Sequence, residues 1–66
     1  MRLWRARKRH DRIDALLERT GSRWVLQFIR NDRVLLTRRY AREAPARAEA
    51  AERLKELQRA GWVDHW

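Results

Sequence analysis

Residues 23–40 read RWVLQFIRNDRVLLTRRY and carry a clear secondary-structure pattern. It contains two runs rich in β-branched, aromatic and aliphatic residues, at 23–30 and 34–40, which are typical of strands. Between them stand Asn31 and Asp32, residue types that tolerate the left-handed backbone of a tight turn. The stretch therefore predicts a β-hairpin.

The register of this hairpin has two alternatives. The first strand has an alternating apolar face, formed by Trp24, Leu26 and Phe28. A loop of three residues would add the alternate residues of the second strand to that face, namely Val34, Leu36 and Tyr40. A loop of two residues would instead place Leu35 opposite Phe28. Because a slip of one residue reverses the face that a strand buries, the sequence leaves both registers open.

The segment before the hairpin, residues 12–20, fits a helix or a third strand. As a helix it would be capped by Asp11 and would give a helix-hairpin-helix fold. As a strand it would use Gly21 and Ser22 as a two-residue turn, with Leu17 opposite Leu26. Ala15 would then face Phe28 on the same apolar side. We favour the strand, because it produces one coherent core.

The C-terminal part of the chain predicts a helix over residues 46–60, which are strong helix formers. Pro45 suits the first turn, because its missing N–H has no helical partner there. Ala50, Leu54 and Leu57 form an apolar stripe. After the helix, Gly61 is a suitable C-terminal cap and lets Trp62 fold back.

The predicted fold class is α+β: a three-stranded antiparallel meander with one C-terminal helix packed on one face. Residues 12–66 would form this single ββ(β)α domain, and residues 1–11 a basic N-terminal arm. The expected core combines the apolar face of the sheet with the helix stripe: Ile13, Leu17, Trp24, Leu26, Phe28, Leu36, Ala50, Leu54, Leu57 and Trp62.

The pattern over residues 15–62 resembles small bacterial proteins of uncharacterised function. In these, three strands, the last ending in basic-basic-aromatic as in Arg38-Arg39-Tyr40, precede a helix that ends in Gly-Trp, as in Gly61-Trp62. The resemblance implies this order of elements and no particular activity. The strand order is also similar to the arm-site-binding domain of tyrosine recombinases, which reads DNA with a three-stranded sheet; that likeness concerns the fold alone.

The charge of the chain points to an acidic partner. It has 17 Lys and Arg against 9 Asp and Glu, a formal net charge of +8. Residues 1–12 and 22–42 each carry a net charge of +5, whereas residues 13–21 and 43–66 each carry −1. A basic surplus gathered in two blocks is typical of proteins that bind nucleic acid.

Catalytic and cofactor chemistry are not expected. There is no cysteine, the only serine lies in a predicted turn, and the two histidines, His10 and His65, stand near opposite ends. A catalytic triad or a zinc site needs several converging donors. We therefore expect no enzyme activity, no metal or other cofactor and no small-molecule substrate. No apolar run approaches the ~18 residues of a membrane span, so we expect a cytoplasmic protein.

The candidate nucleic-acid contacts combine positive charge with hydrogen-bonding and stacking groups. Arginines and lysines would pair with phosphates, a tryptophan could stack on a base, and Arg and Gln on a sheet can reach base edges. In the arm these residues are Arg2, Trp4, Arg5, Arg7, Lys8 and Arg9; on the outer sheet face they are Arg23, Gln27 and Arg39.

An alternative function is protein interaction, as a regulatory homodimer or with an acidic protein partner. The outer face of the predicted sheet also carries aliphatic residues that a small monomer has no reason to expose together: Leu16, Val25, Ile29 and Leu35.

Overall fold

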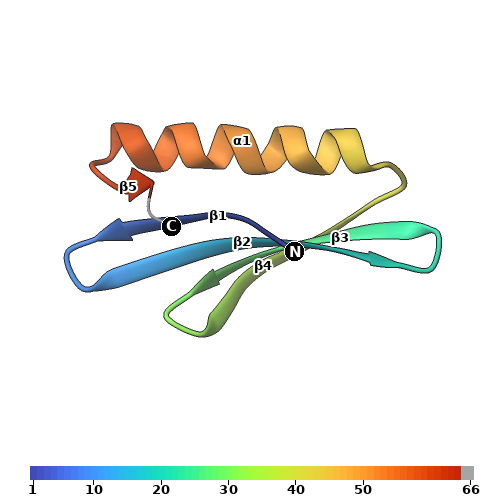
Figure 1. Cartoon of the computed structure of the whole chain (residues 1–66), viewed down its shortest axis with the longest axis horizontal. Coiled ribbons are helices and arrows are strands. Elements are labelled where there is room, and N and C mark those ends of the chain that lie inside the picture. The colour runs from blue at the N-terminus through green and yellow to red at the C-terminus, as the bar shows by residue number, and fades with distance from the viewer. Residues whose placement is uncertain (65–66) are drawn as a thin grey trace.

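The computed structural model describes residues 1–64; His65 and Trp66 lie outside the described residues. Along the chain the elements are β1 (Arg2–Lys8), β2 (Asp11–Thr20), β3 (Arg23–Arg30), β4 (Arg33–Tyr40), α1 (Glu43–Arg59) and β5 (Val63–Asp64). The strands form one antiparallel sheet in the order β4-β3-β2-β1-β5. The helix runs along one side of this sheet, which we call the inner face (Figure 1). The α+β class with a C-terminal helix is confirmed, but the described sheet has five strands instead of the predicted three.

The segment that could have been helix or strand is a strand. Its pairing with β3 sets Leu17 opposite Leu26 and Ala15 opposite Phe28, as the strand alternative predicted. Gly21 has a φ of 64°, a left-handed conformation that glycine adopts without steric cost. Tertiary pairing therefore overrides the local helix propensity of this segment.

The predicted N-terminal arm is instead part of the sheet. Residues Arg2–Lys8 form β1, which pairs with β2, and its far edge is joined beside Ala6 and Arg7 by the short β5. Alternate residues of a strand face the same side, so Trp4 and Ala6 both point to the helix. They are 4% and 0% exposed. The prediction of an arm was wrong, because among so many arginines only Trp4 and Ala6 show the apolar alternation of a strand.

The β3–β4 hairpin combines features of both predicted registers. Its turn has two residues, Asn31 and Asp32, both with positive φ. The register then shifts at a bulge, after which Leu36 lies opposite Phe28 and Tyr40 opposite Trp24 on the inner face. The extra residue of a bulge reverses the alternation of its strand. A two-residue turn therefore still delivers the inner face predicted for a three-residue loop, and only Val34 is moved out of it.

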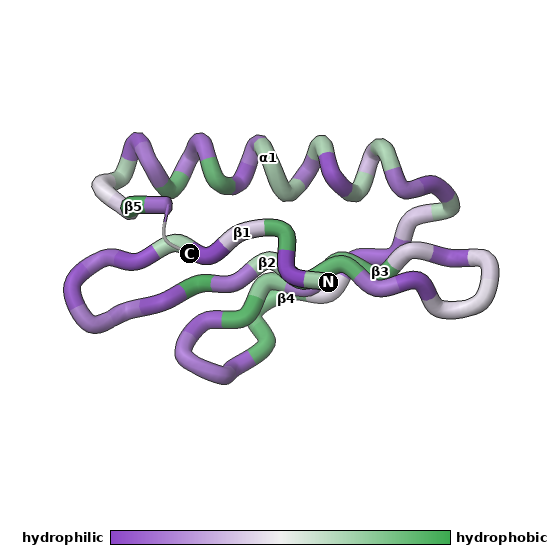
Figure 2. Tube along the Cα trace, viewed as in Figure 1, coloured by the Kyte–Doolittle hydropathy of each residue, from purple (hydrophilic) through white to green (hydrophobic). Residues whose placement is uncertain are grey.

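The core lies between the helix and the inner face. Figure 2 shows hydrophobic stretches along the strands beneath the helix and hydrophilic residues at the β1–β2 and β3–β4 turns. The helix approaches closely because small residues meet there: Ala6, Ala15, Ala46 and Ala50 are at most 1% exposed. All ten predicted core residues are buried or packed against the core. The helix is capped as predicted, since Gly61 has a φ of 98° and the Trp62 amide donates to Leu57 O.

Candidate functional site

Trp4 was predicted as a base-stacking residue, and the structure places it in the core. Its indole Nε1 donates a hydrogen bond of 2.8 Å to the carbonyl of Ala50 on the helix. Its ring lies against Phe28, with 5.9 Å between the ring centroids. A buried indole that has its hydrogen-bond partner inside the fold cannot also stack on an external base, so the predicted role of Trp4 is wrong.

The charged residues of β1 are divided between internal contacts and the surface. The Arg5 guanidinium donates two hydrogen bonds to the Asp14 carboxylate, at 2.6 and 3.3 Å, and this interaction raises the pKa of Arg5. Lys8 donates from Nζ to Ala60 O at the end of the helix. Arg7 lies on the outer face and Arg9 in the β1–β2 turn, and among residues 1–64 neither has an ion pair.

At the end of the sheet that contains the β1–β2 and β3–β4 turns, three carboxylates form ion pairs with three arginines. We call this the paired end. Besides Arg5, Asp14 lies 3.5 Å from Nε of Arg12, whose Nη2 donates to Asp32 at 2.9 Å. Hydrogen bonds from Asn31 and then Arg30 lower the pKa of the Asp11 carboxyl. The charges of Arg5, Arg12 and Arg30 are neutralised within the protein, whereas Arg7, Arg9 and Arg33 at the same end have no ion pair among residues 1–64. The residues of the paired end are Arg5, Asp11, Arg12, Asp14, Arg30, Asn31 and Asp32.

The opposite end of the sheet has a cluster of arginines without acidic partners. It lies where the β2–β3 turn meets the end of β4 and the start of the helix, and we call it the basic end: Arg19, Arg23, Arg38, Arg39 and Arg42. In the described chain none of the five forms an ion pair. The two carboxylates nearby are already occupied, Glu18 by the N-terminal ammonium and Glu43 by Arg47.

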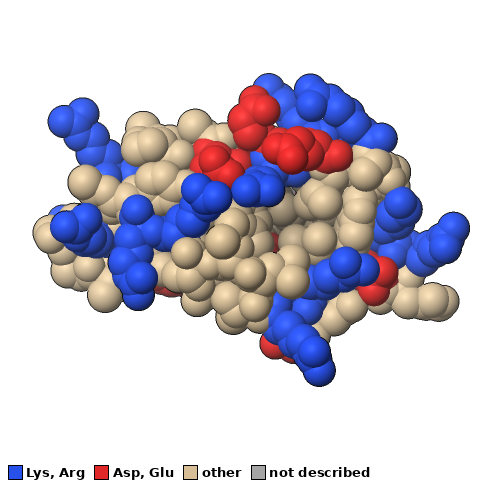
Figure 3. Space-filling view, turned by 180° about the vertical axis from the view of Figure 1, so that it is seen from behind, with Lys and Arg blue, Asp and Glu red and all other residues tan. Residues whose placement is uncertain are grey.

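Strand pairing holds this cluster together. Trp24 lies opposite both Arg19 on β2 and Tyr40 on β4. Arg38, opposite Leu26, lies on the same inner side of the sheet, whereas Arg39, opposite Val25, lies on the outer face at the same end. The Arg19 guanidinium lies 5.8 Å from the centroid of the Trp24 ring. Figure 3 shows Lys and Arg projecting on all sides of one face of the molecule, whereas Asp and Glu gather mainly towards the helix. Mutual repulsion among unpaired arginines is relieved by a bound anion, so this geometry suits a polyanion.

The outer sheet face carries the remaining predicted residues. Gln27 lies there with its Nε2 3.3 Å from Thr37 Oγ1, and Arg39 lies beside Val25. Arg2 also lies on this face, opposite Leu16. Four aliphatic side chains lie on this face around the central pair Gln27 and Thr37, and we call them the outer aliphatic cluster: Leu16, Val25, Ile29 and Val34.

Leu35 does not belong to that cluster, although the sequence predicted it there. The bulge in β4 turns it to the helix side, where it lines a pocket with Phe28 and Leu57. Val34 takes its place on the outer face, opposite Ile29. Leu16, Val25 and Ile29 lie on the outer face as predicted, with Gln27 between Val25 and Ile29, and their role in binding stays a prediction.

Sequence reasoning treated the two basic blocks as equal, and the structure separates them. In the first block Arg5 and Arg12 have carboxylate partners, whereas in the second only Arg30 has one within residues 1–64. The alternation of Trp4 and Ala6 before the turn-like pair Arg9-His10 was the signal that could have revealed β1. In the described part, no three His, Cys, Asp or Glu side chains meet as metal ligands. No described helix is both long and apolar enough to span a membrane.

Comparison with known proteins gives no relative from which to transfer a role. No protein-family model, curated protein or solved structure matches the chain. The function must therefore be argued from the surface itself.

Proposed function

We propose that this chain is a cytoplasmic binding protein, not an enzyme, and that it binds nucleic acid through phosphate contacts made chiefly by the basic end. The observation that carries this proposal is the group of five neighbouring arginines without a carboxylate partner in the described chain. Arg–phosphate pairs can be bidentate, and the counterions that they release drive binding at low salt.

The position of the aromatic residues supports phosphate contact over base stacking. Trp4 and Phe28 are core residues, and Trp24, Tyr40 and Trp62 pack against the core from the inner face. The outer face thus offers Arg, Gln and Thr but, among the described residues, no aromatic platform for bases. Affinity should depend strongly on salt and weakly on base sequence, because phosphates carry no sequence information.

The candidate residues from the sequence divide into two groups under this proposal. Arg23 and Arg39 belong to the basic end, and Gln27 on the same sheet face extends it with a hydrogen-bonding group. Arg5 and Lys8 are held by partners inside the fold, so they contribute less. Arg7 and Arg9 lie at the far end and would add only secondary contacts.

Charge-neutral variants at the two ends test this proposal. In the triple variant Arg23→Gln, Arg39→Gln and Arg42→Gln, the slope of log K against log salt should fall by about 2 to 3, at ~0.9 per lost duplex phosphate contact. The measurement is fluorescence anisotropy on a random duplex and a random single strand at several salt concentrations.

The matched control removes the same charge at the other end, as Arg7→Gln, Arg9→Gln and Arg59→Gln. Its salt slope should change by less than about 1, because these arginines would meet few phosphates. An equal loss in both triple variants would show that net charge, not the basic end, governs binding. Absence of binding by the unaltered protein at low salt would refute the proposal.

The outer aliphatic cluster favours a second candidate function, a homodimer or an acidic protein partner held over this face. Val34 is 55% exposed, and Leu16, Val25 and Ile29 are half-buried beside it. Aliphatic residues interspersed with neutral polar ones, with arginines at the margin, are a composition that protein interfaces can have. Both functions can coexist, because a two-fold dimer would bring two basic ends together.

A lysine in the cluster tests the dimer. Ile29 lies directly opposite Asp14, so Ile29→Lys adds charge without placing two carboxylates side by side, as Ile29→Asp would. If the cluster is a dimer interface, the unaltered protein should sediment as a dimer and Ile29→Lys as a monomer. Val63→Lys, an equal change at an exposed residue of β5, should leave the mass unchanged. A monomer at all concentrations would exclude the homodimer.

A further inference from the structure

The two edges of the sheet differ. The edge at β1 is joined by β5 beside Ala6 and Arg7. The edge at β4 has no neighbouring strand in the described chain, so its outward-facing backbone groups are unpaired. An eight-residue edge strand is long enough to template pairing with another extended chain.

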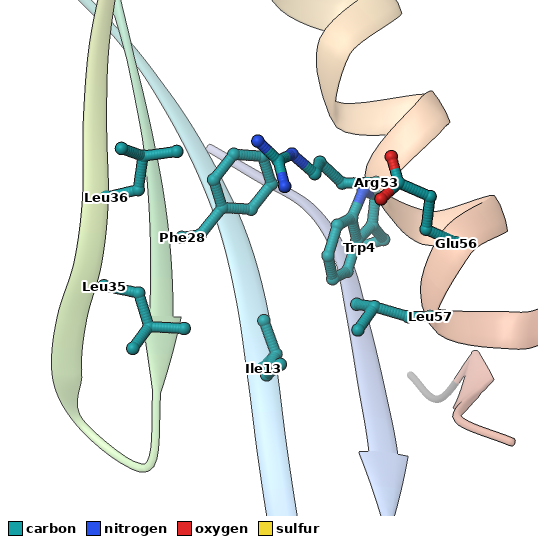
Figure 4. Close-up of a pocket in the computed structure, with 8 residues that line it drawn as sticks. All are labelled: Trp4, Ile13, Phe28, Leu35, Leu36, Arg53, Glu56 and Leu57. Carbon is teal, nitrogen blue, oxygen red and sulfur yellow. The ribbon is translucent and has the colours of Figure 1, made fainter. Parts of the chain in front are cut away.

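A groove of about 190 Å³ lies between this edge and the helix; its lining is mainly apolar, and Arg53 and Glu56 of the helix border it. Figure 4 shows Leu35 and Leu36 on the β4 side, Leu57 on the helix side, and Phe28 among the residues between them. Leu35 is 56% exposed, since the bulge turns it out of the alternation of the strand without burying it. A chain added beside β4 would therefore find backbone hydrogen-bonding groups and an apolar side-chain site together, the two requirements of strand addition.

The positive charge of the β4 edge indicates what kind of chain could pair with it. β4 carries Arg33, Arg38 and Arg39, none of which has an ion pair within residues 1–64. An incoming strand with Glu or Asp at some positions and aliphatic residues at others would satisfy both the arginines and the groove. Cross-strand pairs of opposite charge stabilise a sheet, and like charges directly opposite destabilise it.

A second copy of this chain fits the edge poorly. If two β4 strands paired antiparallel, the register that sets Leu35 opposite Leu36 would place Arg33 opposite Arg38, and the register that sets Leu36 opposite Leu36 would place Arg33 opposite Arg39. The register that sets Leu35 opposite Leu35 would place Arg33 opposite Thr37. Two of these three registers therefore set like charges opposite one another, and none forms a pair of opposite charges within residues 33–40. The edge is therefore complementary to an acidic segment of another protein.

We propose that β4 and the adjoining groove bind an extended, acidic and aliphatic segment of a partner protein, which joins the sheet beside β4. This site goes beyond the nucleic-acid surface proposed above and does not depend on it. Leu35, Leu36 and Phe28 would contact its aliphatic side chains, and Arg33 and Arg38 its carboxylates.

A labelled ten-residue peptide of alternating Leu and Glu, with blocked termini, serves as the probe, and alternating Leu and Lys as its control. The Leu/Glu peptide should bind the full chain at least tenfold more tightly in an anisotropy titration. Leu35→Asp should weaken its binding at least tenfold. Val63→Asp makes the same change at an exposed aliphatic of the other edge and should change binding less than twofold.

Hydrogen exchange distinguishes strand addition from attraction to any basic surface. Bound peptide should slow amide exchange within residues 33–40 and leave 2–8 unchanged. If Leu35→Asp fails to fold, Leu35→Ser with Val63→Ser replaces that pair of variants. Equal affinity for both peptides, no protection at 33–40, or self-association through β4 that the peptide cannot displace would each overturn the proposal. Nucleic-acid binding by the Leu35 variant is scored separately, so failure at one site is not mistaken for failure at the other.

Discussion

Trp4→Ala is expected to lower the free energy of unfolding by about 3–5 kcal/mol, the usual cost of removing a large aromatic side chain from a core. The indole is 4% exposed, packs on Phe28 and holds the helix through Ala50 O. A domain of 66 residues has roughly 3–10 kcal/mol of stability in all. The variant should therefore be largely unfolded in urea concentrations at which the unaltered protein remains folded.

Trp4→Phe separates the two contributions of this residue, because it keeps an aromatic ring and removes the hydrogen bond to the helix. Its loss should be clearly smaller than that of Trp4→Ala. Urea denaturation followed by circular dichroism measures both variants. If Trp4→Ala instead kept full stability and weakened nucleic-acid binding, Trp4 would have to be a surface contact, contrary to the structure.

Asp14→Ala should cost about 1–3 kcal/mol of unfolding free energy, since it leaves guanidinium groups without their acceptor in a partly buried site. The Asp14 side chain is 12% exposed and lies within 4 Å of both Arg5 and Arg12. Among the described residues, Nε of Arg12 is a buried nitrogen without a hydrogen-bond partner. Removal of Asp14 would also take away the nearest negative charge from that nitrogen.

Asp32→Asn is the control, because Asp32 pairs with the same Arg12 from a side chain that is 90% exposed, and Asn removes its charge while tolerating the positive φ of this turn position. Its effect on the free energy of unfolding should stay within about 0.5 kcal/mol, as for most exposed ion pairs. Chemical denaturation of the two variants in one buffer gives the comparison. Equal losses would mean that burial does not distinguish the two carboxylates.

The elements governed by local patterns could be predicted from the sequence. Leu17 meets Leu26, and Leu54 and Leu57 pack on the sheet, because period and turn chemistry agree there. The first strand was missed because arginine-rich strands carry little apolar signal: only Trp4 and Ala6 mark its inner face. The bulge near Leu35 could not be predicted, because the turn and the apolar pattern each indicated a different register. The bulge combines a two-residue turn with the burial of Leu36.

For the candidate site, the sequence predicted which segments are basic, but not which of their arginines would pair with carboxylates in the fold. The block at residues 22–42 remained basic because its neighbours along the chain supply few acids. The first block met Asp14, nine residues from Arg5, through the register of β1 against β2. Ion pairs of this kind depend on the register of a hairpin, which composition does not contain. Net charge per segment therefore overstates the available surface charge wherever the segment becomes an interior strand.

Because the two edges of the sheet differ, repeated strand addition could form only assemblies of limited size. An open-ended fibril needs each molecule to offer one edge to the next and accept another on its opposite side. Here two of the seven residues of the far edge strand, Ala6 and Arg7, are already paired with the chain's own Val63 and Asp64. Growth from β4 would end after a single addition, which favours small, finite complexes over polymers.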